Sequence, residues 1–171
     1  MIAGMTTFTF VHVVISLVGI FSGLFVVFGM IAGRRLDGMT ALFLATTVLT
    51  SITGFMFPYH GFSPAIGVGI LSLLLLAIAL YARYSRHMVG SWRRTYVITA
   101  LIALYLNVFV LVVQLFEKVA SLHALAPKGS EPPFAITQGV VMGIFIALCV
   151  FAVKGFREQP VAIRERAKRA A

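Results

Sequence analysis

The sequence has little charge and almost no cysteine. Charged residues make up 11% of the 171 residues and only five of them are acidic, whereas soluble domains carry about 25% charged residues. Apolar residues reach 60%. A chain of this length cannot hide that much apolar surface from water, so an ordinary soluble domain is excluded. The single cysteine, Cys149, excludes an internal disulfide framework and a cysteine-based zinc site.

Charge is also missing from the interior of the long apolar runs. Proton and ion pathways usually display intramembrane Asp, Glu, Lys or Arg, so a proton-coupled pump or an ion channel is not expected. The sequence shows no Ser/His/Asp set, glycine-rich phosphate loop or paired acids either. It therefore does not favour an enzyme.

Five long apolar runs dominate the chain, and they cover residues 8–32, 40–57, 65–84, 95–116 and 134–153. Each fits the roughly 17 to 25 residues that a helix needs to cross a bilayer. The runs are continuous and lack the alternation of membrane strands, and lipid offers the backbone no hydrogen-bond partners. The sequence therefore predicts an all-α polytopic membrane protein with five transmembrane helices in one bundle over residues 1–154, followed by a basic tail over 155–171.

The positive residues predict the orientation of these helices. Twelve of the fourteen Lys and Arg residues follow the first, third or fifth run, and only Lys118 and Lys128 lie on the other side. Cytoplasmic loops carry the Lys and Arg excess, which predicts an N-terminus outside and a cytoplasmic C-terminus. The net charge of +9 then reflects contact with the lipid bilayer, and nucleic acid is not an expected partner because little chain lies outside the membrane.

Asp37, in the first inner turn, is predicted to be a solvated partner of Arg34 or Arg35.

Small residues recur at helical spacing within the runs. Gly19 and Gly23 form one such pair, and Gly139 and Gly143 form another. Small residues four positions apart let membrane helices approach closely. Both pairs predict close contacts within the bundle, and the seam of a homodimer or a contact with a membrane partner protein is the alternative.

Polar side chains gather toward the predicted outer face. His12, Gln114 and Gln138 come from three runs and fall at similar depth. His12 and Gln138 lie about 6 Å below the outer ends of their helices at ~1.5 Å per residue, and Gln114 lies slightly shallower. Tyr59 and His60 follow the second run. We expect at least two of the three embedded side chains to face one another around an outward-opening cavity that Tyr59 and His60 partly cover. The leading interpretation is a non-enzymatic membrane component that binds a partner or a small ligand there.

The alternative is a redox or cofactor-binding membrane subunit. Histidine is the commonest metal ligand and also ligates haem, so His12, His60 and His123 are candidate metal or haem ligands. Gln114 and Gln138 could orient a quinone. Plain bonds to neighbouring helices explain the same residues, and no cofactor is predicted.

Several segments together resemble a known group of proteins. They are Thr53–Pro58, His60–Ala65, Asn107–Val119 and Ser130–Phe134. These segments are similar to those of small inner-membrane proteins of alpha-proteobacteria and their relatives, and the resemblance covers nearly the whole chain. It implies a bacterial inner (plasma) membrane and implies no particular activity. The five-helix cytochrome b subunit of respiratory nitrate reductase has the same predicted topology, but this sequence has no histidine within its second or fifth run, so that subunit's axial ligands have no counterpart here.

Overall fold

A computed structural model describes residues 6–58 and 64–157, and these residues are helical almost throughout. The helices are α1 (Thr7–Ile31), α2 (Asp37–Gly54), α3 (Pro64–Leu80), α4 (Ser91–Lys118), α5 (Ala120–His123) and α6 (Pro132–Gly155), with a π-helical turn, η1 (Tyr81–Ser85), continuing α3. The all-α bundle expected from the apolar runs is confirmed.

Four helices in the described part of the chain are long and apolar enough to cross a membrane. They cover Thr7–Ile31, Pro64–Ser85, Ser91–Lys118 and Pro132–Gly155. The prediction of five such helices is wrong for the run at 40–57, because α2, with 18 residues, is long enough but not apolar enough. It begins at Asp37 and carries six Ser or Thr residues, which lower its hydropathy.

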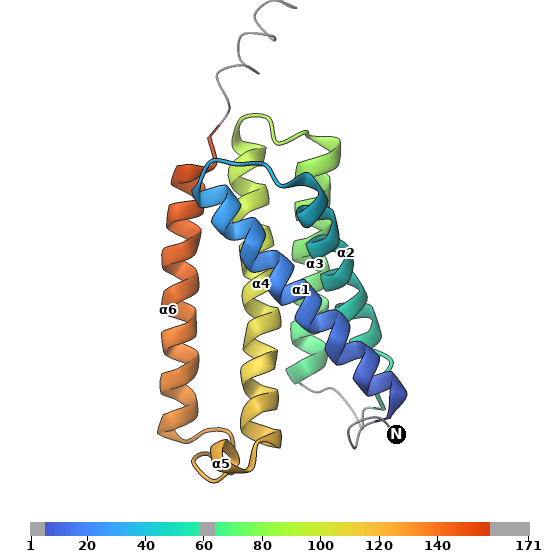
Figure 1. Cartoon of the computed structure of the whole chain (residues 1–171), viewed down its shortest axis with the longest axis vertical. Coiled ribbons are helices and arrows are strands. Elements are labelled where there is room, and N and C mark those ends of the chain that lie inside the picture. The colour runs from blue at the N-terminus through green and yellow to red at the C-terminus, as the bar shows by residue number, and fades with distance from the viewer. Residues whose placement is uncertain (1–5, 59–63, 158–171) are drawn as a thin grey trace, which may run out of the picture.

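The helices stack side by side along the long axis of the molecule (Figure 1). α1, α3 and α6 run in one direction, and α2 and α4 return the chain between them, while the short α5 joins α4 to α6 at the end where α1 begins. α4 supplies much of the core, since Tyr96, Ala103 and Leu104 are fully buried. The start of α1 and the end of α6 therefore lie at opposite ends of the bundle.

α1 crosses α4 obliquely, and glycine makes the crossing possible. A Cβ atom added to Gly23 would lie 2.6 Å from Leu104 Cδ1 and 2.9 Å from the ring of Phe43, so the close contact predicted for the first glycine pair exists. The contact predicted within this chain for Gly139 and Gly143 is wrong, because a Cβ at either position meets nothing within 4 Å. α6 presents that face outward, and a partner there stays a prediction.

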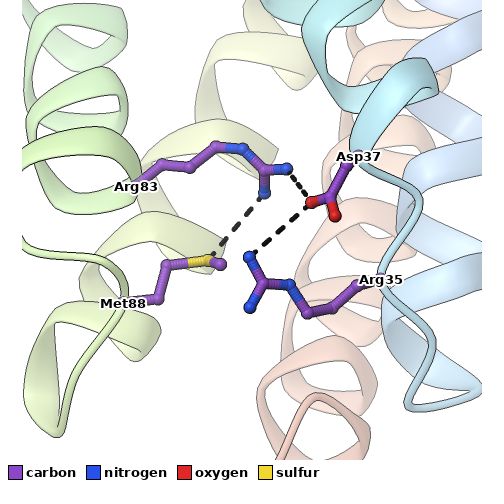
Figure 2. A network of polar contacts seen from close by, with 4 residues as sticks. All are labelled: Arg35, Asp37, Arg83 and Met88. Carbon is purple, nitrogen blue, oxygen red and sulfur yellow. Dashed lines mark hydrogen bonds and ion pairs between the residues drawn. The ribbon is translucent and has the colours of Figure 1, made fainter.

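A buried arginine joins the ends of α2 and η1 (Figure 2). Arg83 comes from η1 with its side chain only 6% exposed, and it donates a hydrogen bond to Asp37 Oδ1 at the start of α2. Arg35 approaches the same oxygen at 3.6 Å. The sequence-based assignment of Asp37 to Arg34 or Arg35 is therefore incomplete, because the π-helical turn directs Arg83 across the bundle to the same carboxylate.

Candidate functional site

A cavity of about 690 Å³ lies between α1, α2, α3 and α4. It forms on the N-terminal side of the α1–α4 crossing, where the two helices diverge toward the end of the bundle that carries α5 (Figure 1). Gly23 holds α1 against Leu104, and the wall begins within one turn of this contact, at Ile20 and Leu106. The cavity therefore exists because α1 crosses α4 obliquely.

The cavity opens at that end of the bundle. Its lining includes exposed side chains at the end of α2, the start of α3 and the end of α4, among them Phe55, Ala65, Gln114 and Lys118. Deeper residues such as Ile20 and Ser72 are buried. The mouth of the cavity therefore lies at this end of the bundle, and its closed part lies near the α1–α4 crossing.

Most of the wall is apolar, with hydroxyl, amide and imidazole groups set into it. The polar lining residues are Thr9, His12, Ser16, Thr50, Ser51, Ser72, Asn107, Gln114 and Lys118. Two of their buried atoms, Thr50 Oγ1 and Asn107 Nδ2, lack a hydrogen-bond partner within the described residues. Buried polar atoms are nearly always paired, so both atoms are available to bond a molecule in the cavity.

His12 is fixed at the wall by contacts with α2 and the segment after it. Its Nδ1 lies 2.7 Å from Thr53 Oγ1, and its ring meets the ring of Phe57 edge-on at 5.1 Å between centroids. On the opposite wall, α3 and α2 are joined by a hydrogen bond between Ser51 Oγ and Ser72 Oγ, which lie 3.2 Å apart. The polar groups therefore come from all four helices.

The sequence-predicted outer cluster is only partly assembled here. His12 and Gln114 line the same cavity. Gln138 does not join them, because its side chain turns toward α4 and its Nε2 donates to Phe109 O at 3.2 Å. Gln138 thus binds α6 to α4 and is not among the residues that line the cavity. Tyr59 and His60 lie outside the described residues.

The histidines of the described chain are held apart. His123, on α5, lies 3.3 Å from Phe116 O through its Nδ1, whereas His12 bonds α2. Among residues 6–58 and 64–157, no group of three His, Cys, Asp or Glu side chains is placed to hold a metal ion. His60, the third candidate ligand, falls outside those ranges.

The residues that sequence reasoning missed come mainly from α2 and α4. Thr50, Thr53 and Asn107 were visible as small or polar residues at helical spacing, a pattern that also suits plain helix packing. Their place at or beside the cavity depends on the divergence of α1 and α4, which the spacing does not reveal. The chain matches no protein-family model, no curated protein sequence and no solved structure.

Proposed function

We propose that this protein is a multi-pass protein of the bacterial inner membrane that binds a small amphipathic molecule in its cavity and does not itself catalyse a reaction. The main support for this proposal is the cavity. Its volume of about 690 Å³ falls in the range of about 300–1,000 Å³ typical of small-molecule sites, which combine apolar walls with a few placed polar groups. The titratable lining residues are His12 and Lys118, and the ring of His12 already bonds Thr53.

The proposed orientation places the N-terminal end outside and the C-terminal end in the cytoplasm. Charge supports it, because the described positive residues concentrate at the end of the bundle where α1 finishes: Arg34, Arg35, Arg83, Arg86, Arg93, Arg94, Lys154 and Arg157. Lys118 and Lys128 lie toward the other end. The Lys and Arg excess marks the cytoplasmic side, so the cavity faces the outer leaflet.

Two matched serine substitutions test the orientation. In a Cys149→Ala background, Ser130→Cys, in the exposed segment between α5 and α6, should react with an impermeant maleimide added to whole spheroplasts. Ser91→Cys, exposed at the start of α4, should react only after the membrane is opened. The reverse pattern would contradict the orientation.

A cavity-filling variant tests the binding function. Ser16→Phe places a ring in the cavity, so the amount of small molecule that co-purifies, measured by native mass spectrometry, should fall about tenfold or more, equivalent to ~1.4 kcal/mol. Val18→Phe, two residues along α1 on an exposed face, is the control and should leave occupancy unchanged. Equal occupancy in both variants and the parent would refute binding in this cavity.

A redox subunit is the second candidate function, and one observation favours it. His12 and Asn107, whose Nδ2 lacks a hydrogen-bond partner within the described residues, line one cavity, which suits a quinone. The metal or haem set of His12, His60 and His123 gains no support from the described residues, where His12 and His123 bond different elements. A visible absorption spectrum of the purified protein separates the candidates. A Soret band would favour the redox subunit over the proposal above, and metal analysis extends the test to colourless ions.

A further inference from the structure

The proton of Thr53 decides the hydrogen-bonding role of His12. Thr53 Oγ1 donates to Leu49 O at 2.7 Å, one turn back along α2. A hydroxyl has one proton to give. The contact with Leu49 O and the 2.7 Å contact with His12 Nδ1 are both satisfied as hydrogen bonds only when Thr53 donates to Leu49 O and accepts from Nδ1. Nδ1 therefore carries the proton of the neutral imidazole, which leaves Nε2 as an acceptor.

Neighbouring rings hinder a flip of the His12 imidazole, which would exchange the positions of its two nitrogens. Phe57 packs edge-on against it, and Phe8 packs against Phe57 with 5.0 Å between ring centroids. Within the described residues, Thr53 is the hydrogen-bond partner of the His12 ring. His12 thus lines the cavity with its Nδ1 engaged by Thr53, and in this tautomer Nε2 is the nitrogen left to accept a hydrogen bond.

The position of His12 matches the polar end of an amphipathic molecule. It lies five residues into α1, about 7.5 Å along the helix axis, while Leu17, Ile20 and Leu106 form the wall farther in. A polar group at His12 therefore stays near the mouth while an apolar body extends inward. Lys118, at the same mouth, disfavours a cationic headgroup.

We propose that the cavity selects neutral apolar molecules bearing a hydroxyl group, which donates a hydrogen bond to Nε2 of His12. This inference rests on the binding function proposed above and names the chemistry of its ligand. A hydroquinone headgroup and a long-chain or sterol-like alcohol share that chemistry. A molecule with only acceptor oxygens at this end leaves Nε2 unpaired.

A matched ligand pair tests the proposal. Purified protein is offered equal amounts of 1-hexadecanol and its methyl ether, and native mass spectrometry gives the ratio of the two bound forms. The alcohol should be bound about tenfold more than the ether, the order expected from one hydrogen bond. In His12→Phe the ratio should fall to about one. Because the ratio is internal to each sample, partial unfolding of a variant does not alter it.

Two threonine variants test whether the preference for the alcohol depends on the tautomer of His12 or only on the presence of a histidine. Thr53→Val keeps His12 but removes the group that sets its proton, so the alcohol preference should shrink. Thr46→Val removes a threonine of α2 with the same type of backbone bond, to Leu42 O, and should keep the preference. Equal shrinkage in both variants would contradict the role given to Thr53.

The outcomes also distinguish this inference from the proposed function. Equal binding of alcohol and ether, both lost in Ser16→Phe, would overturn the hydroxyl selection and leave the cavity as a binding site. Binding that Ser16→Phe does not reduce would overturn the proposed function itself. A second pair, a decyl-substituted hydroquinone against 1-hexadecanol, identifies the source: selection of the hydroquinone indicates a quinone-pool molecule, and selection of hexadecanol indicates an alcohol.

Discussion

Gly23→Leu should leave the protein strongly destabilised or unfolded in detergent. A Cβ alone would lie 2.6 Å from Leu104 Cδ1 and 2.9 Å from two atoms of the Phe43 ring. Neither neighbour can move aside, because Leu104 is fully buried and Phe43 is 2% exposed. Overpacking a tight core costs about 1–3 kcal/mol or more, and leucine adds three further carbons at the point where α1 crosses α4. Thermal unfolding of the purified protein measures the loss.

Gly143→Leu provides the matched control for this prediction. In α6, as in α1, the substituted glycine lies four residues after another glycine. A Cβ at Gly143, however, meets nothing within 4 Å. Its unfolding temperature in detergent should stay close to that of the parent. Gly23→Ala should fall between the two. Similar losses for Gly23→Leu and Gly143→Leu would mean that the crossing of α1 and α4 is wrong.

The two glycine pairs show what a sequence pattern can and cannot predict. Spacing of four places both residues of a pair on one face of a helix, and this much was correct for each pair. Whether a neighbour covers that face depends on the tertiary arrangement. α1 lies against both α2 and α4 at Gly23, whereas α6 leaves its glycine face open. Local spacing carries no information about that difference.

The outer polar residues show the same limit. Depth along a helix is predictable from residue number at about 1.5 Å per residue, and His12 and Gln114 do line one cavity. Gln138 has similar estimated depth but bonds Phe109 O, because its direction around the helix axis depends on how α6 packs on α4. The cavity itself arises from the oblique path of α1, which no single segment of the sequence encodes.

The membrane spans were predictable as apolar runs, but α2 was not correctly classified. Its leucines and alanines gave a run that resembled a span, while its hydroxyl residues Thr47 and Ser51 turn inward and are buried. These hydroxyls bond the carbonyls one turn back, Phe43 O and Thr47 O, at 2.7 and 3.0 Å. A helix with this many inward polar groups depends on its neighbours more than on its own hydropathy.

Asp37→Ala should destabilise the protein well beyond the usual effect of removing an exposed acid. The carboxylate is the ion-pair partner of Arg83, whose side chain is 6% exposed and whose guanidinium carbon lies 5.4 Å from the centre of the Tyr96 ring. Met88 Sδ, at 3.9 Å from Nη1, offers only a weak acceptor (Figure 2). Removing one partner of a fully buried pair costs about 3–5 kcal/mol because a charge is left uncompensated. Asp37 is 67% exposed, so we expect a cost below that range, about 2–3 kcal/mol.

A double-mutant cycle identifies the cause of this loss. Arg83→Met keeps a long side chain and removes the buried charge, so adding Asp37→Ala in that background should cost less than about 1 kcal/mol, as for an exposed residue. Arg35→Ala is the control, because Arg35 is 52% exposed and lies 3.6 Å from the same carboxylate oxygen; its removal should cost about 0–1 kcal/mol. Chemical unfolding in mixed micelles, followed by the fluorescence of Trp92, gives the four free energies. An undiminished cost of Asp37→Ala beside Arg83→Met would show that Asp37 acts through the start of α2 and not through Arg83.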